Sequence, residues 1–225
     1  MDNNDSDNNI VMRSIQIVNA MCEADFGVGV RSLKIVNSMY DTDLGVRINL
    51  IDAYRHLKKT TNWSFNLYRC RPHMLVIYLP PFNRNVQLFA NGKIQALGRL
   101  SPSVARSMIL LVSIHLLPHM WPMTSSTLAL VTLNLLNMVI CIQLSRRVLL
   151  NRFSNLTCHR YACYEPELFP ALRIHRWLPI HVNVFANGRC VITGLTNRSC
   201  VDLVIILSKV LRFLKFYNLL SLECC

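Results

Sequence analysis

Seven residues, from Tyr164 to Pro170, combine side chains that suit two different kinds of recognition. Tyr164 and Phe169 are aromatic, Glu165 and Glu167 are acidic, and prolines stand at positions 166 and 170. Proline fixes φ and lacks a backbone donor, so the segment is predicted to run extended or to turn. Because its acids stand out in a strongly basic chain, we expect these side chains to face a partner outside the fold.

The composition favours a polyanionic partner. The 225 residues include 24 basic and 12 acidic side chains, a formal net charge of +12. Such a balance suits nucleic acid or an anionic membrane surface. The length allows one large domain or two small ones. The nine cysteines include no C-x-x-C pair, which favours reduced thiols over a zinc site, so neither metal nor cofactor is predicted.

A long apolar stretch raises the alternative of a membrane protein. No Asp, Glu, Lys or Arg occurs between Ser107 and Leu144, and a run of this kind approaches the length of a span. Pro118, Pro122 and the Thr124–Thr127 segment interrupt it. We therefore expect a helix, a linker and a strand over residues 128–142. The polar, acidic residues 1–14 are expected to form a disordered tail and not a signal peptide.

Two internal repeats organise the chain. Ile17–Met21 returns eighteen residues later as Ile35–Met39, and both copies are predicted to be strands, by duplication or by chance similarity. Residues 86–98 return 96 residues later as 182–194, and each copy contains Asn-Gly, which is typical of a hairpin.

A three-residue hairpin loop is predicted because it separates apolar from polar side chains. With Gly92 left-handed, Gln87 pairs with Gln95, and the apolar residues share one face, which is the predicted core. These residues are Val86, Leu88, Ile94 and Ala96, with Val182, Val184, Cys190 and Ile192 in the second copy. A helix is predicted to follow each hairpin and cover its apolar face, one beginning at Ser101-Pro102-Ser103 and one capped by Asn197.

The opposite face presents Phe89 and Phe185 among amides and cations, including Lys93 and Arg189. Aromatic and cationic side chains on one sheet surface favour nucleic-acid binding. The alternative is an ordinary solvated face with one aromatic in each copy.

Tyr-Glu-Pro-Glu-Leu-Phe-Pro, followed by a hairpin with Phe-x-x-Gly-Lys/Arg, resembles the TATA-box-binding protein family. Residues 124–225 match this family well and residues 15–123 match weakly. The resemblance implies an α+β saddle, in which two pseudo-symmetric repeats form one curved antiparallel sheet with helices on its convex face. It also implies binding in the DNA minor groove and bending by phenylalanine wedges, which is well-known behaviour of this family.

The resemblance and the chemistry of the open face together give a set of candidate sites. His73 stands where the family has a wedge phenylalanine, Lys34 replaces a central asparagine, and Gln95 and Leu97 replace valine and threonine. Weaker or altered sequence preference is therefore expected. Glu165 and Glu167 match the acidic loop that contacts transcription factor IIB, whereas the apolar helix of the first repeat lacks the basic surface for factor IIA. The predicted DNA-binding residues are Val36, His73, Phe89, Lys93, Asn137, Val139, Phe169, Phe185, Arg189, Val191 and Thr193.

The leading hypothesis is a divergent initiation factor that bends promoter DNA beside a factor IIB-like partner. The alternative is a protein-only adaptor that binds factor IIB with little DNA affinity. An enzyme is not expected, because no paired carboxylates or Lys/Asp constellation in a helix–hairpin–helix setting occur as in DNA glycosylases. The expected location is the nucleus or the transcription site of a large DNA virus.

Overall fold

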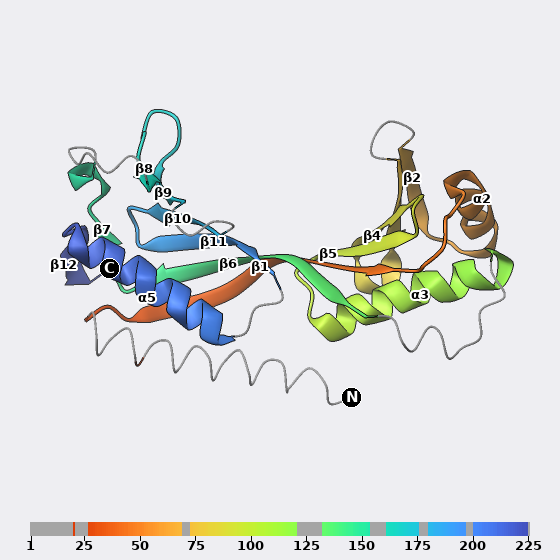
Figure 1. The fold of residues 1–225 in the computed structure, drawn as a ribbon, viewed down its shortest axis with the longest axis horizontal. Coiled ribbons are helices and arrows are strands. Elements are labelled where there is room, and N and C mark those ends of the chain that lie inside the picture. The colour runs from red at the N-terminus through yellow and green to blue at the C-terminus, as the bar shows by residue number, and fades with distance from the viewer. Residues whose placement is uncertain are drawn as a thin grey trace. The chain divides into compact units, whose positions relative to one another are not determined.

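The computed structural model describes residue 20 and residues 27–68, 73–120, 132–153, 161–175, 180–196 and 200–224. The chain divides into two compact units, residues 37–137 and residues 1–36 with 138–225, called here the first and the second unit. The boundaries expected from sequence, 15–123 and 124–225, differ chiefly in the place of the N-terminal segment. Figure 1 shows the elements of each unit.

The first unit is an antiparallel sheet with two helices. Its strands are hydrogen-bonded in the order β2-β3-β4-β5-β1, and β1 also has residues in the second unit. In chain order the elements are β1 (Val30–Asp43), α2 (Leu50–Thr60), β2 (Ser64–Tyr68), β3 (Met74–Leu79), the 3-10 turn η1 (Pro80–Phe82), β4 (Arg84–Phe89), β5 (Lys93–Gly98) and α3 (Pro102–Met120).

The described part of the second unit has a similar layout, with a sheet and the long helix α5 (Cys200–Phe216). Its strand order is β1-β6-β11-β10-β9-β8, and β7 pairs separately with β12. The remaining elements are β6 (Asn134–Leu144), β7 (Arg146–Val148), the 3-10 turn η2 (Leu150–Arg152), β8 (Ala162–Cys163), β9 (Ala171–Ile174), β10 (His181–Phe185), β11 (Arg189–Leu195) and β12 (Leu220–Cys224).

Each sheet buries one face beneath a helix, α3 in the first unit and α5 in the second (Figure 1). All eight hairpin residues predicted to be core are fully buried. They pack with Met108 and Val112 of α3 or with Leu207 and Leu211 of α5. The α+β class with antiparallel strands and helices on one face is therefore confirmed.

The predicted three-residue hairpin loops are also confirmed. Gln87 lies opposite Gln95, and Gly92 has φ +90 with its N–H donating to the Phe89 carbonyl at 3.0 Å. Gly188 has φ +81 and donates in the same way to Phe185 at 3.0 Å. A left-handed glycine lets the chain turn without a Cβ penalty, so both copies close in the same geometry.

Other local expectations need correction. The strand expected over residues 128–142 begins at Asn134, and α3 continues through Pro118 to Met120. Ile35–Met39 lies in β1 as predicted, but Ala20, the described residue of the earlier copy, is helical. Residues 1–14, the Thr124–Thr127 linker and the Asn197 cap lie outside the described residues. Within the described part of the chain, no helix combines the length and apolar character that a membrane crossing requires.

Candidate nucleic-acid interface

The sheet face of the second unit that lies opposite α5 gathers most of the predicted site residues of that unit. Strand alternation places Val139, Phe185, Arg189, Val191 and Thr193 on this open face, while their neighbours Cys190 and Ile192 are fully buried. Val191 lies opposite Cys141 and Asn183 in the adjacent strands. The Arg189 Nε–H donates to the Cys141 thiol at 3.0 Å. The result is a surface of small apolar, hydroxyl and amide groups with a cation near its outer end.

Phe169 and Phe185 meet at that outer end. Their ring centroids are 6.0 Å apart with an interplanar angle of 64°, an edge-to-face arrangement. Both rings are half-buried. Phe185 lies opposite Ala171, a small residue in β9. The structure therefore brings together the two aromatic side chains that the sequence separates by sixteen residues.

The acidic segment forms a tight turn that holds Phe169. The N–H groups of Leu168 and Phe169 both donate to the Glu165 carbonyl, at 3.0 and 2.9 Å. The predicted extended or turning conformation is confirmed as a turn. Leu168 remains 78% exposed, so the turn presents an apolar side chain next to Glu167, which is also exposed.

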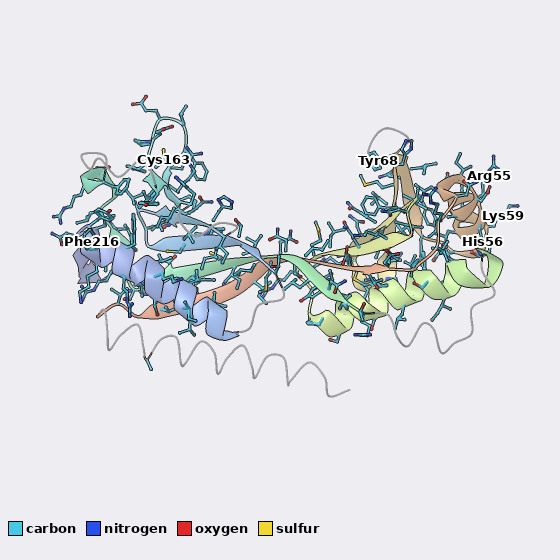
Figure 2. The ribbon with its side chains drawn as sticks, in the orientation of Figure 1. Arg55, His56, Lys59, Tyr68, Cys163 and Phe216 are labelled. Atoms are coloured by element: carbon cyan, nitrogen blue, oxygen red, sulfur yellow. The ribbon has the colours of Figure 1, made fainter. Side chains whose placement is uncertain are left out.

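The Glu165 carboxylate contacts two residues of strands β8 and β9. It accepts the Cys163 thiol hydrogen at 3.0 Å and pairs with Arg173 at 3.8 Å. Figure 2 shows Cys163 in the hairpin formed by β8 and β9. A hollow of about 330 Å³ opens beside it and includes Arg173, His175 and His181 in its lining. Sequence reasoning missed Arg173 as the partner of Glu165, because the pairing depends on the β8–β9 register.

The thiol of Cys163 offers a direct test of this contact. Its hydrogen bond to the Glu165 carboxylate, followed by burial, raises the pKa of Cys163 above its usual value, partly offset by Arg173. A thiol with a raised pKa has less reactive thiolate at a given pH. Glu165→Gln is therefore expected to speed iodoacetamide labelling of Cys163 at mildly alkaline pH, measured by peptide mass spectrometry.

Cys190 serves as the internal control for that measurement. It is fully buried, and burial raises its pKa to about 12, so it should stay unlabelled in both proteins. Equal labelling rates of Cys163 in the wild-type and Glu165→Gln proteins would show that this hydrogen bond does not control the thiol.

The open face of the first unit is chemically different. Phe89 is half-buried and Lys93 is exposed. Gln87 of β4 lies opposite Gln95 of β5, two residues further from the hairpin loop. Asn137 is half-buried at the end of this unit, and Val36, 48% exposed, is the last residue of the N-terminal part of the second unit. The first-unit face thus holds Gln95 and Leu97 where the second holds Val191 and Thr193.

His73 lies just before β3 and is exposed. Phe185 pairs with Ala171, and Phe169 stands two residues before that partner. Phe89 pairs with Met74, and the residue two positions before Met74 is residue 72, which lies outside the described residues. By strand register, His73 is therefore one position away from the counterpart of Phe169.

In the described part of the chain, no group of three or more His, Cys, Asp or Glu side chains is arranged to hold a metal ion.

Comparison with known proteins adds a family pattern and a fold. Residues 132–215 match the family model described as transcription factor TFIID, or TATA-binding protein. A solved structure of the Methanococcus jannaschii TATA-binding protein superposes with a TM-score of 0.63 at 24% sequence identity, covering 83% of this chain and 99% of the other. No curated protein sequence matches the chain. Residues 132–215 therefore carry the sequence pattern of the TATA-binding protein family, and the fold of the archaeal TATA-binding protein extends over most of the chain.

Proposed function

We propose that the chain is a TATA-binding-protein-like transcription factor that binds AT-rich promoter DNA in the minor groove with its open sheet faces and bends it. The Phe169–Phe185 pair carries this proposal. Two apolar rings at the end of a sheet face can enter a base step, and the cost of unstacking is offset by the larger sheet surface that bent DNA touches.

The rest of the open face supports the same role. Val139, Val191 and Thr193 present methyl and hydroxyl groups suited to the shallow floor of an AT-rich minor groove, which displays only acceptors from its bases. Arg189 is an exposed cation beside the hairpin loop of the second unit, where a phosphate of the bound duplex would pass. The net charge of +12 adds long-range attraction for DNA.

The two units give equivalent backbone contacts, which supports an origin by internal duplication. Gly92 and Gly188 each accept a hydrogen bond at 3.0 Å, from Leu44 and Leu144 respectively. The side chains of the two faces have nevertheless diverged, with Gln95 at the first-unit position that Val191 occupies in the second. We therefore propose that the second unit supplies most of the preference for AT-rich sequence.

A factor IIB-like protein is the proposed protein partner of the Glu165–Phe169 turn. Carboxylates are repelled by a phosphate backbone, so Glu167 suits a basic protein surface better than DNA. Leu168 adds an exposed apolar contact. Since Glu165 is engaged by Arg173 and Cys163, it orders the turn, and Glu167 with Leu168 makes the outward contact.

A second candidate function is a protein-only adaptor, favoured by the loss of groove-type side chains from the first-unit face. One experiment separates the two functions. Fluorescence energy transfer across an end-labelled TATA duplex and a scrambled duplex, at fixed salt, should show bending that is stronger on TATA. Failure of the purified chain to bend or bind either duplex, with retained binding to a factor IIB-like protein, would leave the adaptor.

A further inference from the structure

The first unit carries a row of large apolar side chains, and two of them have no role yet in the proposed DNA interface. Tyr68 at the end of β2 lies opposite Met74 in β3, and Met74 lies opposite Phe89 in β4. Residues directly opposed across antiparallel strands bring their side chains into contact range. Tyr68, Met74 and Phe89 therefore form one continuous row, called here the Tyr68 row.

The Tyr68 row lies on the open face and not in the core. The adjoining residues Leu75 and Leu88 are fully buried beneath α3, and alternation directs Met74 and Phe89 to the other side of the sheet. Tyr68 is 48% exposed, and Figure 2 shows it at the tip of β2. Lys93, at the far side of the hairpin loop from Phe89, is exposed and extends the row with a cation.

The residues beside the hairpin phenylalanine differ in the second unit. There the residue opposite the hairpin phenylalanine is Ala171, and the ring beside Phe185 comes from the turn, as Phe169. In the first unit the residue opposite Phe89 is Met74, whose side chain is much longer and more flexible than that of alanine. Apolar bulk next to the hairpin phenylalanine thus comes from strands β2 and β3.

We infer that the Tyr68 row is the first unit's base-step wedge, with Tyr68 and Met74 joining Phe89 against a terminal base-pair step of the bound duplex. This inference rests on the proposed DNA-binding function and deepens it. A tyrosine ring offers an apolar face for stacking while its hydroxyl stays in water at the sheet edge. Lys93 is placed to meet a neighbouring phosphate. His73 has no wedge role in this arrangement.

The test uses the full chain and an AT-rich duplex with 2-aminopurine, whose fluorescence rises on unstacking, at both terminal steps of the site. Tyr68→Thr removes the ring but keeps a residue that favours strand conformation. It is expected to weaken binding about tenfold and to halve the fluorescence rise. Phe169→Ala should halve the rise independently, and the double variant should abolish it. Reporters at both ends make the result independent of which way round the protein binds.

Three controls make the test specific. Tyr78→Thr removes another exposed tyrosine from β3 on the same face, and His73→Ala removes the neighbouring ring. At saturating protein, both variants should keep the full fluorescence rise. Tyr68→Phe should restore the fluorescence rise. The melting curves of Tyr68→Thr and of the three control variants, measured by circular dichroism, should match the wild-type curve.

The inference is overturned if Tyr68→Thr keeps the full fluorescence rise, if Tyr78→Thr or His73→Ala lowers it as much, or if single-stranded DNA is affected more than the duplex. It is also overturned if the loss of binding follows a lowered melting temperature that Tyr68→Phe does not restore. Absence of duplex binding by wild type is a different result, because it refutes the proposed function itself.

Discussion

Replacing Phe169 with alanine is expected to weaken binding to an AT-rich duplex by about tenfold or more and to reduce the bend of the bound DNA. The ring is held in two ways, by the backbone turn onto the Glu165 carbonyl and by edge-to-face contact with Phe185 at 6.0 Å. Alanine removes the apolar group that would replace lost base stacking. Titration of an end-labelled duplex, read by energy transfer, gives affinity and bend together.

Leu168→Ala is the matched control for Phe169→Ala. Leu168 belongs to the same turn and is 78% exposed, but it is not part of the aromatic pair. This variant should bend DNA like wild type and lose affinity for a factor IIB-like partner, as should Glu167→Gln. If Phe169→Ala bends DNA normally, or if Leu168→Ala is equally defective, the aromatic pair is not the wedge.

Gly188→Ala is expected to destabilise the protein by about 3 kcal/mol or more. Gly188 has φ +81, a conformation that costs an L-residue about 1 kcal/mol by itself. In addition, a Cβ at this position would collide with the Arg146 carbonyl oxygen. Relief of the collision requires displacing the backbone whose Leu144 N–H donates to Gly188. The free energy of unfolding from urea titration measures the loss.

Gly45→Ala provides the control for the backbone conformation alone. Gly45 has φ +70, and a Cβ there meets nothing within 4 Å. This variant should lose about 1 kcal/mol, and Gly92→Ala should behave like Gly188→Ala because its Cβ would meet the Val46 carbonyl. Equal losses for Gly45→Ala and Gly188→Ala would show that close packing over the hairpin loop is unimportant.

The hairpins and their buried faces were predictable from sequence because both signals are local. Asn-Gly fixes where the chain turns, and strict alternation then divides Val86, Leu88, Ile94 and Ala96 from the residues between them. The start of α3 was likewise visible, since the Ser101 hydroxyl accepts the Val104 N–H at 3.3 Å. Helix α2 was missed, although Asn49 caps it and Leu50, Ala53 and Leu57 form a buried stripe.

By itself the sequence determined the hairpins, the helix over each apolar face and the turn at Glu165 to Phe169, because each depends on residues only a few positions apart. The tertiary structure alone decided which side chains meet. Phe169 reaches Phe185, Glu165 reaches Arg173, and Met74 with Tyr68 stands beside Phe89. These meetings depend on the register between separate strands, and a shift of one residue sends a side chain to the opposite face of the sheet.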